Sequence, residues 1–483
     1  MEKIKLFRVE SVPCTYACNP ASSGAYLTRK PALIPDALPA YHGEPVRIAA
    51  GRPVLFWVDV PLSNSDAVVT FQAISRKNTI QGSLKLPIHV IPARLPAQAI
   101  RHSEWLHCDC LCNAHNCEMF SDRFWDILKN YLLTASSHCI DTLLTPVITP
   151  SLDIEPNCSR LSCQLVTIYR NHGRYNYDFS RLRKWVALAQ SCGIRYFEIA
   201  PFFTQWGAAY AAQIYEETPL GTHALFGWDT PAYSPEYRDF LADFLPALVK
   251  ELEALQILSE TFFHISDEPT QKNLQNYQRA KEMVAPYLQG CKLIDALSDH
   301  VFLEQGLVSI PVVAEDQLTP FLADASHREV WTYCCCAQDR LVPNFFLSMP
   351  LTRTRILGPL LYRFELRGFL HWGYNFWNSQ FSKAAIDPYR ITDSDGGFPS
   401  GDAFLVYPGT DDRPVSSIRL KTLRDAWVDY QALCLLESLE NREAVLSLIQ
   451  NTLGDISFTE YPVKEEIYQS FYTALCEAIT PLL

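Results

Sequence analysis

Short hydrophobic runs alternate with helical patterns over most of the chain. Eight runs have the length and composition of buried strands: 105–110, 139–146, 194–202, 261–267, 292–297, 307–313, 329–335 and 368–375. Between them, hydrophobic residues recur at helical spacing, as they do over 240–252. Strands that alternate with helices favour a parallel sheet. Eight such units in succession predict an α/β fold, a (β/α)8 TIM-type barrel whose last helix covers 418–436.

The segment before these units follows a different pattern. From residue 44 to residue 96, hydrophobic and polar positions alternate with period two, and turn-forming clusters separate the runs. This pattern predicts a small antiparallel β-sandwich. We therefore expect three parts: an N-terminal β-sandwich over 1–98, the barrel over 99–440, and a C-terminal helical tail over 441–483 that packs on the barrel.

Two segments interrupt the regular alternation of strand and helix. Residues 165–179 have the pattern of a β-hairpin that turns at Asn171 to Gly173. Residues 203–233 form a long stretch rich in aromatic residues and glycine after the third predicted strand. Loops of this length are typical of lids or of binding walls.

Composition and charge limit the classes of partner. The formal net charge is -12, and no basic stripe is present that could neutralise phosphates, so we do not expect a nucleic-acid partner. No apolar run approaches the roughly 20 residues of a membrane span. The first residues lack the apolar core and cleavage site of a signal peptide. The 16 cysteines then fit reduced, buried thiols, and we expect a cytoplasmic protein.

Two adjacent carboxylates, Asp267 and Glu268, end the hydrophobic run 261–267. Charge at the end of a buried strand is costly unless it has a purpose. Pro269 disfavours helical backbone at Glu268, so we expect the chain to remain extended there and to turn both carboxyl groups towards one cavity. The alternative is that the pair caps the helix that follows.

Polar and aromatic residues gather near the other predicted strand ends, where barrels carry their reactive groups. The candidates for ligand contact are Asp109, Gln205, Trp206, His264, Asp295, Trp331, Tyr333, Trp372, Asn375 and Trp377. Carboxylates ringed by aromatic side chains suit a sugar, because aromatic faces stack on its C–H-rich faces while acids bind its hydroxyl groups. The alternatives are that the aromatic rings fill the barrel core and that His264 packs along its strand.

Several sequence blocks resemble those of glycoside hydrolase family 123 and the related DUF4091 domain family. They include TPVITPSLD (145–153), GIRYFEIAPFFTQWGA (193–208), FHISDEP (263–269) and LVYPG (405–409). The resemblance extends over roughly residues 45–440, with the blocks in the family's order. It implies a β-N-acetylgalactosaminidase that needs no cofactor and acts on an oligosaccharide or a glycoconjugate.

The resemblance also implies roles for individual residues. The substrate's own acetamido group would be the nucleophile, which makes this a substrate-assisted, retaining hydrolase rather than one with two facing carboxylates. Glu268 would be the general acid, and Asp267 would hold the 2-acetamido group. Tyr333 is the candidate for a second hydrogen bond to that group. We further expect Trp331 and Trp372 to form the floor of the sugar site. Gln205 and Asn375 are the candidates for binding the hydroxyl groups of the sugar.

Other hypotheses compete with this one. The segment 106–117 contains four cysteines and two histidines, yet it lacks the paired CxxC spacing of a zinc site, so we expect no metal there. A carbohydrate-binding or regulatory protein that keeps the fold without turnover is the second hypothesis. A glycosidase for a different glycoside is the third. The sequence leaves the sugar, its linkage and the oligomeric state open.

Overall fold

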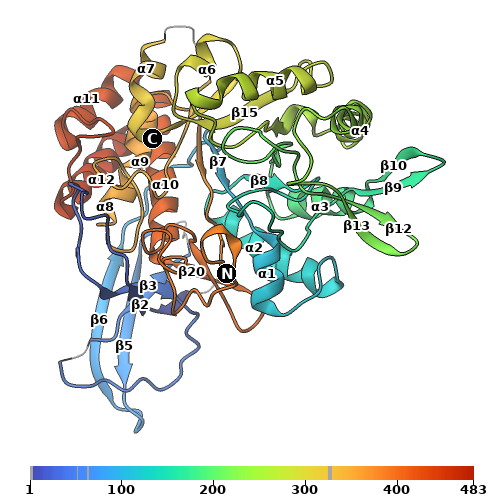
Figure 1. Cartoon of the computed structure of the whole chain (residues 1–483). Helices are drawn as coiled ribbons and strands as arrows, with labels where there is room; N and C mark the ends of the chain where they lie inside the picture. Colours follow the sequence, from blue (N-terminus) through green and yellow to red (C-terminus); the bar gives the residue numbers. More distant parts are fainter. Residues whose placement is uncertain (1–3, 52, 62–64, 325–328) are drawn as a thin grey trace.

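The computed structural model describes residues 4–51, 53–61, 65–324 and 329–483. At its centre, eight parallel strands close into a barrel (Figure 1). In chain order they are β7 (Arg101–Glu104), β8 (Thr142–Thr145), β11 (Tyr196–Ile199), β14 (Thr261–Phe263), β15 (Lys292–Leu297), β16 (Ile310–Ala314), β17 (Trp331–Tyr333) and β18 (Gly368–His371). Strand β18 pairs with β7 and closes the ring. The predicted TIM-type barrel is confirmed.

The first strand lies elsewhere than predicted. Residues 105–110 were expected to be a strand, but β7 ends at Glu104 and helix α1 covers Cys108–His115. The strand itself is polar. Its His102 and Glu104 are buried, and each gives the other a partner, with 3.1 Å between His102 Nε2 and Glu104 Oε1. A search for hydrophobic runs passes over such a strand. The other predicted strands agree with the structure within a few residues at each end.

Helices surround the barrel on the outside (Figure 1). They are α2 (Asp122–Ser137), α3 (Ser180–Ser191), α4 (Pro235–Ala254), α5 (Leu274–Val284), α6 (Val301–Glu304), α7 (Leu318–Ala323), α8 (Thr352–Arg355), α9 (Leu357–Arg363) and α10 (Ile418–Leu439). Serine side chains accept a hydrogen bond from the first turns of α2, α4 and α10, which fixes where these helices begin. The helical face predicted over 240–252 is buried against the barrel core.

Small antiparallel sheets precede the barrel. Strand β1 (Lys5–Arg8) pairs with β4 (Phe56–Asp59), and β5 (Ala67–Ile74) pairs with β6 (Ile80–Ile88). A four-stranded sheet joins β2 (Glu10–Cys14) and β3 (Ala32–Leu38) to two strands from much later in the chain, β19 (Val406–Pro408) and β20 (Pro414–Ser417). The start of the chain is therefore tied to the segment that leads into α10.

The two interruptions are both hairpins. The predicted one is confirmed as β9 (Thr167–Asn171) and β10 (Arg174–Asp178). The stretch 203–233, expected to be a loop, contains β12 (Ile214–Thr218) and β13 (Gly221–Phe226). Strands β12 and β9 lie against each other, and the two hairpins project together from the side of the barrel (Figure 1).

The chain ends in two helices, α11 (Arg442–Leu453) and α12 (Glu465–Ile479), that pack on α10 and on each other. Phe471, Leu475 and Ile479 are buried at the spacing that the sequence indicates. Among the described residues, none of the helices has both the length and the apolar character that a membrane crossing requires.

A buried ion pair fastens the N-terminal strand β3 to the start of α10. Arg419 donates to both carboxylate oxygens of Asp36, at 3.1 Å and 3.0 Å, and the Tyr407 hydroxyl donates to the same carboxylate at 2.6 Å. Asp36 and Arg419 are 1% and 2% exposed. Because water cannot replace either partner, each one depends on the other.

We predict that Asp36→Asn lowers the free energy of unfolding by about 3–5 kcal/mol, since it leaves the buried Arg419 without an anion. Urea unfolding followed by circular dichroism measures this change. The matched control is Arg123→Ala, which removes an exposed pair with Asp412 and should change stability little. Equal effects of the two changes would contradict the structural role of the buried pair.

Candidate active site

A pocket opens at the carboxyl ends of the barrel strands. The residues that line it are Trp105, His107, Leu152, Asp153, Gln205, Trp206, Asp267, Glu268, Ala296, Tyr333, Cys335, Cys336, Leu370, Trp372 and Phe398. They come from the segments that follow β7, β8, β11, β14, β17 and β18, and from β15, β17 and β18 themselves. Six of the sequence candidates therefore share one cavity: Gln205, Trp206, Asp267, Glu268, Tyr333 and Trp372.

The acid pair lies just after β14, and both of its side chains line the pocket. The extended backbone that we expected at Glu268 is wrong, because its φ is 46°, in the left-handed region that glutamate rarely adopts. Such strained backbone is often found at functional sites. The capping alternative is also wrong: the next helical turn begins after Thr270, whose N–H donates to the Asn273 side chain at 2.8 Å.

A glutamine holds Asp267 in place. Gln205 Nε2 donates to Asp267 Oδ2 at 2.9 Å, and Gln205 Oε1 accepts from the backbone N–H of Asp153 at 2.8 Å. The second bond fixes the orientation of the amide, so its NH₂ group must face the carboxylate. The backbone N–H of Trp206 also donates to the backbone carbonyl of Asp267 at 3.0 Å. Asp267 is thus fixed through its side chain and its backbone, and it is only 4% exposed.

Glu268 has a different partner. The Tyr333 hydroxyl donates to Glu268 Oε1 at 3.1 Å. Burial raises the pKa of Glu268, and burial together with the charge of Glu268 raises the pKa of Asp267 well above its usual value. Two neighbouring acids in a dry pocket cannot both ionise easily. The pair therefore retains a proton to a higher pH than free carboxyl groups do.

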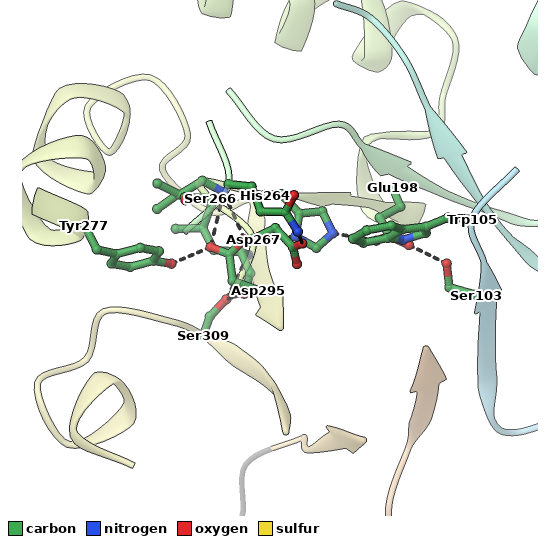
Figure 2. A network of polar contacts seen from close by, with 12 residues as sticks. Ser103, Trp105, Glu198, His264, Ser266, Asp267, Tyr277, Asp295 and Ser309 are labelled. Carbon is green, nitrogen blue, oxygen red and sulfur yellow. Dashed lines mark hydrogen bonds and ion pairs between the residues drawn. The ribbon is translucent and has the colours of Figure 1, made fainter. Parts of the chain in front are cut away.

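A buried chain of charged groups, Glu198, His264 and Asp295, lies close to Asp267 (Figure 2). His264 Nε2 is 2.5 Å from Glu198 Oε1, and His264 Nδ1 is 2.9 Å from Asp295 Oδ1. Burial lowers the pKa of His264, but the two carboxylates outweigh it and raise the pKa to about 10. Glu198 also accepts from the Trp105 indole at 2.7 Å and from the Ser103 hydroxyl at 2.5 Å. The chain thereby orients a tryptophan of the pocket wall.

The same chain fixes the backbone that leads to the acid pair. Asp295 accepts from the Ile265 N–H at 3.2 Å and from the Tyr277 hydroxyl. It therefore joins the end of β14 to β15 and to helix α5. His264 and Asp295 are fully buried below the pocket rather than in its lining. The positive charge of His264 also lowers the pKa of Asp267, which opposes the effect of burial.

A second buried chain orients Trp372. Its indole Nε1 donates to Asp402 Oδ2 at 3.2 Å, and Asp402 Oδ1 is 3.9 Å from His371 Nε2. His371 Nδ1 in turn lies 2.9 Å from Glu104 Oε2. Burial lowers the pKa of His371, but Glu104 and Asp402 raise it to about 9. Sequence reasoning missed Glu104, His371 and Asp402, although charged residues within or next to buried strands were a usable signal.

Two further polar candidates, besides His264 and Asp295, lie outside the pocket lining. Asp109 is on helix α1, where its carboxylate accepts from Arg160 at 2.8 Å and 2.6 Å. Asn375 is fully buried, and its amide bonds the backbone N–H and carbonyl of His107 at 2.8 Å and 3.1 Å. Both side chains thus hold the segment after β7, which carries pocket residues.

Two aromatic candidates lie outside it as well. Trp331 is fully buried inside the barrel, with its ring 4.9 Å from that of Phe262. Trp377 is buried beneath the sheet that contains β19, where its indole donates to the Val406 carbonyl at 3.1 Å. The alternative interpretation, in which aromatic rings fill the core rather than contact a sugar, therefore describes Trp331 and Trp377. The aromatic wall of the pocket comes from Trp105, Trp206, Tyr333, Trp372 and Phe398.

Cys108 and Cys110 fall within the strand predicted over 105–110. They lie instead on helix α1 together with Cys112, and all three are buried. The Cys110 thiol accepts from the Trp377 N–H at 3.3 Å. Across the part of the chain that the structure describes, no group of three or more His, Cys, Asp or Glu residues is placed to hold a metal ion.

The comparisons with known proteins agree with this architecture. The model of the glycoside hydrolase 123 catalytic domain matches residues 105–436. A family 123 glycoside hydrolase from Clostridium perfringens, studied for glycolipid glycan hydrolysis, has a similar structure with a TM-score of 0.72 at 14% identity, over 99% of this chain and 85% of that one. No curated protein sequence matches.

More distant barrels are only loosely similar. A family 5 mannosidase from Rhizomucor miehei has a TM-score of 0.36 at 10% identity, over 74% of this chain and 97% of its own. A β-D-glucuronidase from Dictyoglomus thermophilum has a TM-score of 0.37 at 8% identity, over 88% of this chain and 64% of its own. The family model, by contrast, covers well over half of the chain. This protein therefore belongs to glycoside hydrolase family 123.

Proposed function

We propose that the protein hydrolyses a β-linked 2-acetamido sugar, with N-acetylgalactosamine favoured, by a retaining, substrate-assisted mechanism. The observation that carries the proposal is the shared pocket of Asp267 and Glu268, in which each acid has its own hydrogen-bond partner. Consecutive residues cannot easily face each other across a glycosidic bond, as the two acids of most glycosidases do. One acid must therefore act on the substrate's own nucleophile while the other moves protons.

In the first step, the acetamido oxygen attacks the anomeric carbon and the bond to the leaving group breaks. Glu268 gives its proton to the departing oxygen, and Asp267 accepts a hydrogen bond from the acetamido N–H. Asp267 thereby stabilises the positive charge of the oxazolinium intermediate. In the second step, Glu268 takes a proton from water, which attacks the same carbon and reopens the ring. Two inversions leave the anomeric configuration unchanged.

The electrostatics of the pair support this division of roles. Burial raises the pKa of both acids, so the pair holds a proton to a higher pH than free carboxyl groups do, as a general acid requires. A bound acetamido N–H adds a second donor to Asp267, besides Gln205, and so favours its anion. The shared proton then belongs to Glu268, which is the acid that must donate it.

The Tyr333 hydroxyl is placed to change its hydrogen-bond partner during the reaction. In the free site its hydroxyl donates to Glu268. Protonated Glu268 is a weaker acceptor than the carboxylate, so the hydroxyl becomes available to the acetamido oxygen. Trp105 and Trp372 offer apolar faces for the sugar ring, and buried carboxylates fix both indoles. The substrate class that we propose is an oligosaccharide or a glycoconjugate, such as a glycolipid glycan like that named for the Clostridium perfringens relative.

We predict that Glu268→Gln lowers kcat/KM by about 10²–10⁴-fold on substrates with a poor leaving group, because proton donation is lost. An activated aryl glycoside should lose less, since its leaving group needs little protonation. Asp267→Asn should lower turnover of both kinds of substrate. The assay compares aryl β-GalNAc, aryl β-GlcNAc and a disaccharide.

Binding of an oxazoline-like inhibitor separates the two roles further. Asp267→Asn should weaken it more than Glu268→Gln does. The matched control is Asp239→Asn, which removes an exposed carboxylate on α4 and should change neither turnover nor binding. Unchanged inhibitor binding in both active-site variants would show that the assigned roles are wrong. A parent protein that binds the sugar without hydrolysing it would support the non-catalytic alternative.

The pH profile gives an independent check. Burial raises the pKa of Glu268, and the charge of Asp402 raises it further. Glu268 acts while protonated, so kcat/KM falls as the pH rises through this pKa. We predict that Asp402→Asn lowers the pKa and moves the alkaline limb of the profile to lower pH. An alkaline limb that stays in place would contradict the coupling between these two groups.

A further inference from the structure

Two neighbouring cysteines form part of the pocket wall. Cys335 and Cys336 follow β17 directly, and both line the same cavity as Asp267 and Glu268. Each residue is half-buried, and each contributes to the wall that a molecule in the pocket would face. The mechanism proposed above uses neither thiol.

Hydrogen bonds hold both the backbone and the side chain of Cys335 in place. Gln338 Oε1 accepts from the Cys335 N–H at 3.0 Å and from its thiol at 3.2 Å. The buried Asn344 donates from Nδ2 to the Cys335 carbonyl at 3.0 Å. Cys336 is the next residue in the chain, and its half-buried side chain lines the same pocket. The two cysteines are placed as a vicinal dithiol.

Neighbouring cysteines form an unusual disulfide. Consecutive Cα atoms are about 3.8 Å apart, which is shorter than the ~4.4–6.8 Å of ordinary disulfides. The ring that closes across one peptide bond is therefore strained and easily reduced. Strained, accessible disulfides are the ones that serve reversible chemistry rather than stability.

We propose that Cys335 and Cys336 are a reversible modification site at which a low-molecular-weight disulfide closes the pair into a vicinal disulfide and thereby alters the sugar pocket. The modification itself stands on the arrangement of the thiols. Its effect on hydrolysis rests on the proposed function.

The exchange proceeds in two balanced steps. The Cys336 thiolate attacks the small disulfide and forms a mixed disulfide, while one thiol of the reagent leaves and takes up the proton. The Cys335 sulfur then attacks the Cys336 sulfur, loses its own proton and releases the second reagent thiol. The two protein thiols are oxidised by two electrons, and the reagent is reduced to two thiols.

Closure changes groups that matter to the site. The Cys335 thiol gives up its proton and can no longer donate to Gln338, whose amide also donates to Asp316 at 3.1 Å. Tyr333, which donates to Glu268, lies only two residues before the new ring. A shift of the order of 1 Å at such a group costs about tenfold to a hundredfold in rate.

The test treats the full chain with 2-hydroxyethyl disulfide and then measures both mass and turnover. We expect the peptide that carries both cysteines to lose two hydrogen atoms, and kcat/KM to fall by about tenfold or more. Dithiothreitol should reverse both changes. An oxazoline-like inhibitor in the pocket should slow the modification.

Single serine variants complete the design. Cys335→Ser should stop at a mixed disulfide on Cys336, and Cys336→Ser should give no vicinal disulfide. Cys158→Ser, which removes an exposed cysteine outside the pocket lining, should behave like the parent. Absence of the two-hydrogen loss in the parent would overturn the modification site. Loss of two hydrogens with unchanged turnover would overturn the effect on the pocket, and a parent without any turnover would instead overturn the proposed function.

Discussion

The cost of burying charge governs this molecule. Asp267 is buried and Glu268 is half-buried in one pocket, and burial disfavours the charged form of both carboxyl groups. His264 lies below them between two further carboxylates, Glu198 and Asp295. That chain binds the backbone that leads to the pair. Within it, the charge of His264 lowers the pKa of Asp267 and the charge of Asp295 raises it. The backbone that carries the acid pair is therefore held by buried charged groups that lie outside the pocket lining.

A second buried chain orients another side chain of the pocket wall. Contacts run from Glu104 through His371 to Asp402, which accepts a hydrogen bond from the indole of Trp372. In the same way, Glu198 accepts a hydrogen bond from the indole of Trp105. Each aromatic face is thus oriented by a hydrogen bond from its nitrogen to a buried carboxylate. A flat, fixed surface loses little freedom when a sugar binds to it. Buried carboxylates thus fix the orientation of two tryptophans in the pocket wall.

The sequence predicted the barrel well, because seven of its strands are hydrophobic and separated by helical patterns. It missed β7, whose buried His102 and Glu104 bond each other on the outer face of the barrel and leave no hydrophobic run. It predicted that Asp267 and Glu268 share a cavity at a strand end, and both side chains line one pocket. It did not foresee that Asn375 would bond a backbone segment, because such partners come from 268 residues away in the chain.

The most direct measurement is a crystal structure of the protein with an oxazoline-like inhibitor bound. Our account predicts that the acetamido-derived nitrogen lies within hydrogen-bond distance of an Asp267 oxygen, that Glu268 faces the position of the glycosidic oxygen, and that Trp105 and Trp372 flank the sugar ring. An inhibitor whose ring nitrogen is bound by other groups, with Asp267 still bonded only to Gln205, would contradict it.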